Sequence, residues 1–181
     1  MKKILALITI LTTISILNDY KSEKIEIPKE AIRFRVIASS NSKEDQEIKM
    51  KVKESLEKDL QKVLKGKNNI NDSRLALNKN IPTFENSIKK TLDKENKNIS
   101  YTINYGNNYF PEKEYKDVVY KSGNYESLVV TLGEGNGKNF WCVLFPPLCN
   151  LEKEKEKDEE VEYKFLVKEI LQKYHFWHHK I

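Results

Sequence analysis

The stretch Asn139 to Asn150, NFWCVLFPPLCN, constrains the fold of this chain most strongly. Charged residues make up 33% of the sequence, yet no residue from Phe140 to Pro146 carries a formal charge. Apolar side chains at both odd and even positions of a short run are typical of a strand that is buried on both faces. We therefore expect this stretch to form a central strand of a sheet, beneath helices.

Two periodicities alternate along the rest of the chain. Apolar residues repeat every second position in 31–40, 99–106, 114–120 and 125–132, which predicts strands. They repeat every third or fourth position in about 43–65, 72–79, 81–95 and 161–179, which predicts helices. The three strands after residue 114 are joined by Gly-marked turns, as in an antiparallel meander. The predicted fold class is α+β, with an antiparallel sheet of about five strands and helices packed on one face.

The first 17 residues form a distinct N-terminal segment. Lys2 and Lys3 precede an apolar run from Ile4 to Leu17, which is the pattern of an export signal. As a helix this run would be about 21 Å long, against a hydrocarbon core of ~30 Å. Residues 1–17 are therefore expected to be a signal peptide or an uncleaved membrane tether, followed by a linker over 18–29, a domain over 30–150, and a charged linker with an amphipathic helix over 151–181.

Cys142 and Cys149 are the two cysteines of the chain. A reactive thiol would need a basic neighbour, and a metal site would need further soft ligands, which the flanking sequence lacks. A disulfide requires the two Cα atoms within about 7 Å, which a turn at Phe145-Pro146-Pro147-Leu148 could provide. Export would permit that bond. A disulfide is the favoured interpretation, and two buried free thiols are the alternative.

No motif indicates catalysis or a cofactor. The glycine-rich segment Leu132 to Gly137 joins two predicted strands and lacks the Lys-Ser/Thr of a nucleotide loop, so it predicts a hairpin turn in which Glu134 is a lone carboxylate. His175 and His179 are four residues apart, but without the Glu of a zinc-protease helix they indicate an exposed tail. The net charge of +5, from 32 basic and 27 acidic residues, is too small and too evenly mixed to favour nucleic acid.

Two long segments resemble one known family. They read IRFRVIASSNSKEDQEIKMKVK from Ile32 and YFPEKEYKDVVYKSGNYESLVVTLGEGNGKNFWCVLFPPLC to Cys149. Both are similar, in order, to the stage II sporulation protein R family of endospore-forming bacteria. The chain departs from the family pattern at Phe140, where members commonly have a second Trp, and at Ser40-Asn41-Ser42, where they commonly have Asn-Ser-Asp.

The resemblance implies a signalling protein rather than an enzyme. Family members are exported from the forespore into the space between the two cells, where they trigger a membrane-embedded aspartic protease of the mother cell. That protease then removes the pro-sequence of sigma E. The expected partner is thus the extracytoplasmic face of this protease, together with a contact with the membrane surface, and no cofactor is expected.

Aromatic, proline and arginine residues outside the predicted core are the candidates for partner binding. Arg33 and Arg35 alternate along the first strand and could reach a membrane phosphate or an acidic partner. The remaining candidates lie in the loop before the meander and beyond the last strand: Tyr109, Phe110, Pro111, Phe145, Pro146, Pro147 and Leu148. Two other functions stay open, a cell-envelope enzyme such as a peptidoglycan hydrolase and a passive envelope-binding module.

Overall fold

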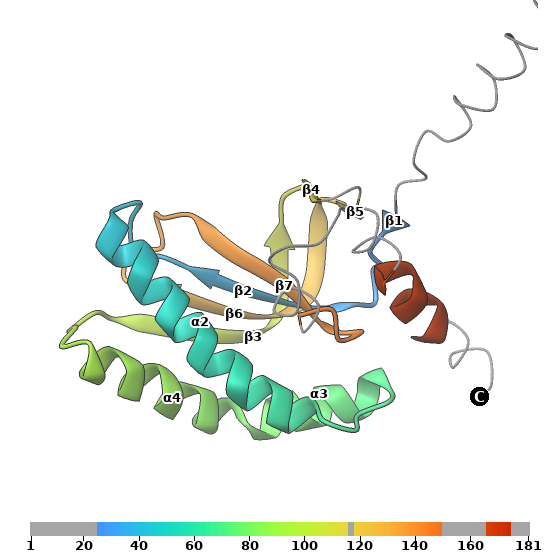
Figure 1. Cartoon of the computed structure of the whole chain (residues 1–181), viewed down its shortest axis with the longest axis horizontal. Helices are drawn as coiled ribbons and strands as arrows, with labels where there is room; N and C mark the ends of the chain where they lie inside the picture. The colour runs from blue at the N-terminus through green and yellow to red at the C-terminus, as the bar shows by residue number, and fades with distance from the viewer. Residues whose placement is uncertain (1–24, 116–117, 150–165, 175–181) are drawn as a thin grey trace, which may run out of the picture.

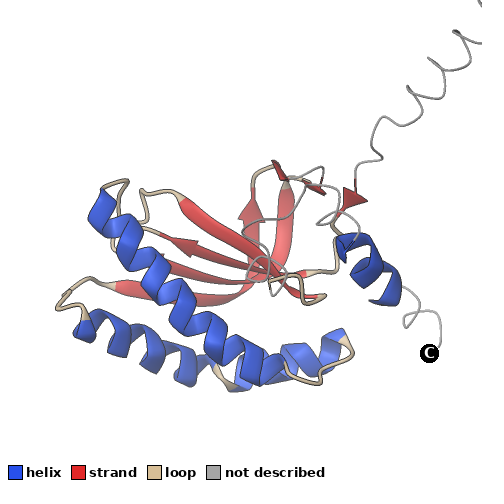
Figure 2. Ribbon diagram, in the orientation of Figure 1, coloured by secondary structure: helices blue, strands red, loops and turns tan. Residues whose placement is uncertain are grey.

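The computed structural model describes residues 25–115, 118–149 and 166–174. Within them, three helices, α2 (Lys43–Leu64), α3 (Ile70–Lys79) and α4 (Ile81–Lys94), lie on one face of a twisted sheet (Figures 1 and 2). A smaller sheet stands over the far end of the opposite face. The α+β class and the placement of helices on one face confirm the prediction.

The main sheet has four strands in the order β3-β6-β2-β7. They are β2 (Ile32–Ile37), β3 (Tyr101–Phe110), β6 (Gly123–Leu132) and β7 (Asn139–Phe145). β2 lies between β6, to which it is parallel, and β7, to which it is antiparallel. β3 pairs with β6 in an unbroken antiparallel register from Tyr101↔Leu132 to Phe110↔Gly123.

This pairing corrects two predictions. The sheet is mixed rather than purely antiparallel, because the first strand enters between β6 and β7 instead of at an edge. The strands after residue 114 form no meander, since β6 and β7 are separated by β2. For the same reason the stretch Asn139–Phe145 is an edge strand of this sheet and not its centre.

The second sheet explains why an edge strand is apolar on both faces. Its three strands, β1 (Ile25–Glu26), β4 (Lys113–Tyr115) and β5 (Val118–Tyr120), follow the order β1-β5-β4. Val143 of β7 packs in a cluster with Val118 and with Val167 of the helix over 166–174. Cys142 and Leu144 point to the other side, into the main core. β7 is therefore covered on both faces although one of its edges is free of β partners among the described strands.

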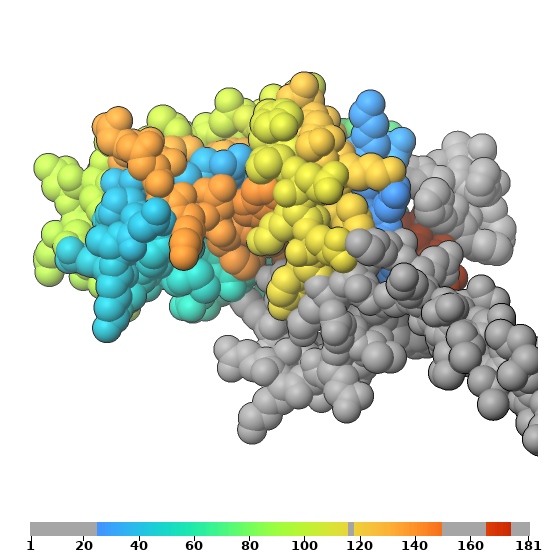
Figure 3. Space-filling model, turned by 90° about the horizontal axis from the view of Figure 1, so that it is seen from above, coloured from blue at the N-terminus to red at the C-terminus, as the bar shows by residue number. Residues whose placement is uncertain are grey.

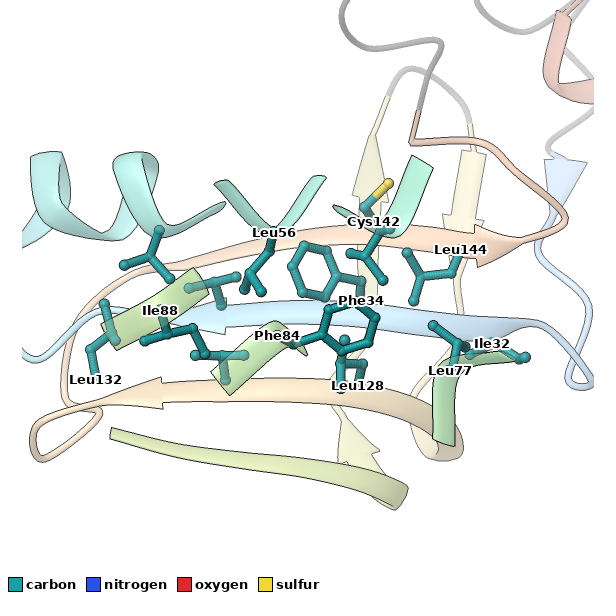
Figure 4. Packing of buried hydrophobic residues seen from close by; sticks show 14 of the residues in the cluster. Ile32, Phe34, Leu56, Leu77, Phe84, Ile88, Leu128, Leu132, Cys142 and Leu144 are labelled. Carbon is teal, nitrogen blue, oxygen red and sulfur yellow. The ribbon is translucent and has the colours of Figure 1, made fainter. Parts of the chain in front are cut away.

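The main core lies between the sheet and the three helices (Figure 4). α2 begins at Ser42, whose hydroxyl accepts a hydrogen bond from the Asp45 N–H at 3.1 Å, as an N-cap does. Its apolar stripe then recurs every fourth residue and faces β2. Pro82 stands in the first turn of α4, where a missing N–H costs nothing. The fully buried members include Phe34, Val52, Leu56, Leu77, Phe84, Ile88 and Leu128.

The predicted N-terminal signal and the charged run over 152–160 lie outside the described residues, as do all three histidines. In the part that is described, none of the helices has the length and apolarity needed to cross a bilayer. The domain boundaries drawn from the sequence stay predictions. Of the C-terminal amphipathic helix, residues 166–174 are described and are helical.

Truncating Phe84 tests the core. Phe84→Ala removes a fully buried ring from between α4 and the sheet, and we expect it to lower the free energy of unfolding by about 3–5 kcal/mol. Leu75→Ala, at a side chain that is 70% exposed, should change it by less than about 0.5 kcal/mol. Urea unfolding of both variants measures this. An equal loss in the two variants would contradict the described core.

Candidate partner-binding surface

Arg33 and Arg35 lie on β2 and point away from the helices. Side chains alternate along a strand, so the core residues Ile32, Phe34 and Val36 occupy the opposite face. On the arginine face the sheet also presents Tyr125 of β6, Phe110 at the end of β3 and Trp141 of β7, which pack together as a small cluster. The sequence pattern thus predicts the direction of both arginines correctly.

Arg33 is buried beneath the small sheet, with 1% of its surface exposed. The central carbon of its guanidinium lies 3.3 Å from the centroid of the Tyr125 ring, and Tyr120 and Phe110 border it at 5.8 and 5.4 Å. The Tyr125 hydroxyl donates to the Lys121 carbonyl oxygen at 2.9 Å. In the described part of the chain, none of the three guanidinium nitrogens has a hydrogen-bond acceptor.

Burial makes this arrangement costly. Desolvation lowers the pKa of Arg33, and the nearby hydroxyls of Tyr125 and Tyr120 only partly oppose it. Arginine nevertheless keeps its charge at neutral pH, because the ordinary pKa of a guanidinium lies far above neutrality. An unpaired buried charge costs several kcal/mol, whereas a cation–π contact returns about 2 kcal/mol. The buried guanidinium of Arg33 thus carries N–H donors that no described group of the protein accepts.

Arg35, two residues along β2, is half-buried and better satisfied. Its Nη1 donates to the Tyr109 carbonyl oxygen at 3.4 Å. In the amide orientation that satisfies both groups, the side-chain oxygen of Asn139 accepts from Nη2 at 2.9 Å and from Nε at 3.2 Å. The guanidinium also borders the rings of Phe110 and Trp141, each at 5.7 Å. Burial lowers its pKa, as it does for Arg33.

These groups form what we call the cation–aromatic surface: Arg35, Lys113 and Trp141, with Arg33 and Phe110 beneath them and the backbone carbonyl of Tyr109 at its border. The Lys113 ammonium lies 5.3 Å from the Trp141 ring, and the Phe110 and Trp141 rings meet edge to face at 5.3 Å. Tyr109 is 61% exposed. Figure 3 views this side, with the yellow residues around β4 against the orange residues of β7. Exposed aromatic and cationic groups on a rigid sheet are suited to bind an acidic protein surface.

The structure brings the first set of sequence candidates together and separates it from the second. Phe110 is buried and Pro111 is exposed, and both lie at the end of β3 beside Arg35. Phe145, Pro146 and Leu148 are buried, so these three form the underside of a turn rather than a binding loop. Pro147 is half-buried. The assignment of all nine candidate residues to partner binding stays a prediction.

The turn at Pro146 to Cys149 borders a pocket of about 270 Å³ at the end of α2. Its lining mixes apolar groups of the turn with Tyr174 and the buried carboxylate of Glu57, which pairs with Lys53 at 3.0 Å. The Phe145 and Tyr174 rings meet edge to face at 4.8 Å. The Phe145–Pro146 peptide bond is cis.

Cys142 and Cys149 form the predicted disulfide, with their Cα atoms 5.4 Å apart. Neither thiol is free, so a cysteine nucleophile is not present in this state. Glu134 is exposed in the turn between β6 and β7, as the glycine-rich sequence predicts. Among the described residues, no group of three or more His, Cys, Asp or Glu could hold a metal ion.

Sequence reasoning missed four residues that surround Arg33 and Arg35: Lys113, Tyr120, Tyr125 and Trp141. Tyr120, Tyr125 and Trp141 lie in predicted strands and Lys113 directly precedes one, and their convergence on the arginines depends on which strands pair. The signal that could have found them is the row of aromatic residues on the polar-facing side of the strands, where a solvated sheet would carry charged groups.

Comparison with known proteins identifies the family. The family model described as "Stage II sporulation protein R" matches residues 28–155. A protein of that name from Bacillus subtilis is 36% identical over 132 residues, which is 73% of this chain and 59% of the relative. The chain belongs to the stage II sporulation protein R family. No solved structure matches it.

The match to the sporulation protein R relative covers only part of that relative's length. The match spans less than two thirds of the length of the Bacillus subtilis protein. The matched residues 28–155 contain the whole cation–aromatic surface and the disulfide. Both features therefore lie within the family domain, while the helix over 166–174 lies beyond it.

The disulfide of this sporulation protein R domain should stabilise it measurably. A cross-link that closes a loop of this length (Cys142 to Cys149) lowers the entropy of the unfolded chain, which corresponds to about 2–3 kcal/mol. We expect Cys142→Ala/Cys149→Ala to lose about this amount in urea unfolding. A reductant should destabilise the wild type similarly and leave the variant unchanged. If the reductant has no effect on the wild type, the cross-link does not contribute.

Removing the charge of Arg33 should stabilise the domain. Arg33→Met retains a long apolar side chain against Tyr125 and eliminates the unpaired cation, so we expect the free energy of unfolding to rise by about 1 kcal/mol or more. Arg33→Lys keeps the charge but loses the planar stacking group, and it should be less stable than the wild type. Thermal unfolding of the wild type and of both variants measures these differences in stability. A destabilised Arg33→Met would show that the stacked guanidinium is a net structural contribution.

Proposed function

We propose that this protein is an exported signal of sporulation that activates a membrane-embedded aspartic protease, which then processes pro-sigma E. The observation that carries the proposal is membership of the stage II sporulation protein R family over residues 28–155. The apolar N-terminal run after Lys2 and Lys3 supports export from the forespore into the intermembrane space, with that segment cleaved or kept as a tether. In this proposal the protein acts by binding and carries out no catalysis.

The cation–aromatic surface supports the recognition step of this proposal. A signal can activate its partner only if it binds the active state more tightly than the inactive one. Carboxylates of the partner would reach Arg35 and Lys113, and the half-buried ring of Trp141 and the exposed ring of Tyr109 nearby would supply apolar anchors. Acidic headgroups at the membrane surface would be attracted by the same cations.

An envelope hydrolase would require a catalytic group that the described residues do not assemble. Cys142 is bonded to Cys149, so it offers no thiolate. Glu134 is exposed in a turn. His175 lies outside the described residues. A passive envelope-binding module would bind purified wall or lipid without the protease, and the experiment below separates it from a signal.

Deleting the gene tests the proposed function directly. We expect pro-sigma E to accumulate unprocessed during sporulation, as seen by immunoblot, and a wild-type copy to restore processing. Normal processing in the deletion strain would refute the signalling role.

The cation–aromatic surface can then be tested with matched substitutions. Tyr109→Ala/Lys113→Glu removes an exposed ring and reverses an exposed charge, and two contacts of about 1 kcal/mol each correspond to a tenfold or greater loss of activation. Leu75→Ala/Lys58→Glu makes equivalent changes on α3 and α2 and should process normally. Equal activity of the two double variants at equal protein levels would place the binding site elsewhere.

A further inference from the structure

β3 forms one edge of the main sheet. It pairs with β6 along all ten residues of the strand, without a bulge or register shift. On its other side no described strand follows. Helix α4 lies beside it on the core face (Figure 1), where Tyr101 Oη meets the Glu85 carbonyl oxygen at 3.3 Å, but the described backbone hydrogen bonds include none from α4 to β3.

The outward peptide groups of β3 can be assigned from the ladder. The Gly133 N–H donates to the Ser100 carbonyl oxygen at 2.7 Å, which makes Ser100 and Gly133 a hydrogen-bonded pair. In an antiparallel ladder such pairs alternate with pairs whose N–H and C=O groups point outward. The odd-numbered residues therefore face away from β6: Tyr101, Ile103, Tyr105, Asn107 and Tyr109. Of these, Tyr101, Ile103, Tyr105 and Asn107 each offer a donor and an acceptor, while the Tyr109 carbonyl oxygen already accepts from Arg35.

The sequence of β3 lacks the features that normally protect a sheet edge. Natural edges are blocked by charged side chains, proline, bulges or short length. The strand Tyr101–Phe110, YTINYGNNYF, has no charged residue and no proline, although 33% of the chain is charged. A free, neutral, unbroken strand of this length is a template for another strand.

The opposite edge differs. At the end of β7 the turn folds back, so that the N–H groups of Leu148 and Cys149 both donate to the Val143 carbonyl oxygen, at 3.1 and 3.2 Å. The disulfide from Cys142 to Cys149 ties that turn to the strand. β7 is therefore obstructed at this end, whereas no described strand or backbone group pairs with the outer edge of β3 from Tyr101 to Asn107.

The edge also fits a particular kind of occupant. A strand pairing on β3 would place alternate side chains beside half-buried Tyr101, Ile103 and Tyr105 on the core face, and the others beside exposed Thr102 and Asn104. A segment with apolar and polar residues in alternation satisfies both faces. At the end of β3, the Tyr109 carbonyl oxygen meets Arg35, so the edge leads directly into the cation–aromatic surface.

Area favours a partner protein over a second copy of this chain. Ten residues of strand are roughly 33 Å long, and a sheet is roughly 10 Å thick, so edge pairing alone covers roughly 330 Å² on each side. Stable interfaces cover about 800 Å² per partner. An extended segment of a partner that continues onto Arg35, Lys113 and Trp141 can supply the difference, whereas a self-paired edge leaves that surface unused.

We propose that β3 captures an extended segment of the signalling partner, which adds to the main sheet as a fifth strand. The proposal deepens the proposed function and rests on it for the identity of the partner, the membrane-embedded protease. Recognition here is through backbone hydrogen bonds, while the cation–aromatic surface reads the side chains and charge that follow the added strand.

Asn107 allows a substitution that changes the edge alone. Its side chain is exposed and its N–H points outward, so Asn107→Pro removes a donor that β6 does not use and inserts a ring into the path of an added strand. Asn107→Ala is the matched control, because it deletes the same side chain and retains the N–H. Both should unfold within about 1 kcal/mol of the wild type.

Each variant is expressed in the deletion strain, with pro-sigma E processing and heat-resistant spores as the two readouts. We expect Asn107→Ala to restore both and Asn107→Pro to lose at least tenfold, at equal protein levels. Equal activity of the two variants, in whichever readout the deletion abolishes, overturns strand addition. If deletion abolishes spores but leaves processing normal, the proposed function fails, and the spore count still tests the edge.

Two physical measurements complete the test. Amide exchange of the protein with the protease in detergent should slow at Ile103, Tyr105 and Asn107, and unchanged exchange there contradicts the proposal. Sedimentation equilibrium of the protein without the protease should give a monomer for the wild type and both variants. A wild-type dimer that Asn107→Pro dissociates would show that the edge serves a second copy instead.

Discussion

The structure depends on the double pairing of β2. This strand is first of the main sheet in the chain, and it pairs in parallel with β6 and antiparallel with β7. The partners of Arg33 are Ser127 and Val143, which follow it by 94 and 110 residues. A parallel pair cannot be closed by a hairpin and needs a crossover, here α2, α3, α4, β3, β4 and β5. Because all three helices belong to that crossover, they pack on one face of the sheet and leave the other face, with Arg33 and Arg35, to the small sheet.

The elements could be predicted from the sequence because their signals are local. The 3.6-residue spacing from Ile48 to Leu60 and the cap at Ser42 define α2, and the proline in α4 lies where a first turn permits it. Strand partners could not be predicted in the same way. The apolar stretch Asn139–Phe145 indicates burial on both faces, which by itself favours a central position in the sheet. A second layer of structure can bury an edge strand equally well, and that is the case here.

The candidate site likewise combines features that local sequence signals predict with features that depend on how the strands pair. Alternation along β2 predicts that Arg33 and Arg35 share a face. The spacing and the proline turn favour the disulfide between Cys142 and Cys149 over two free thiols, and the structure contains that bond. The burial of Arg33 could not be predicted, because it results from Tyr125 and Tyr120, which reach it from β6 and from the small sheet. Leu148 was expected at a surface and is buried, since the turn folds back onto β7.

The tied turn at the end of β7 has a consequence for stoichiometry. Sheets that accept strands at both edges can grow without limit, because each addition presents a new edge of the same kind and identical units assemble into open fibres. Here one edge is obstructed by a covalent loop and the other is open. In the function and strand capture proposed above, a sheet with one open edge engages one polypeptide and then stops, so the exposed strand of β3 binds its partner without polymerising.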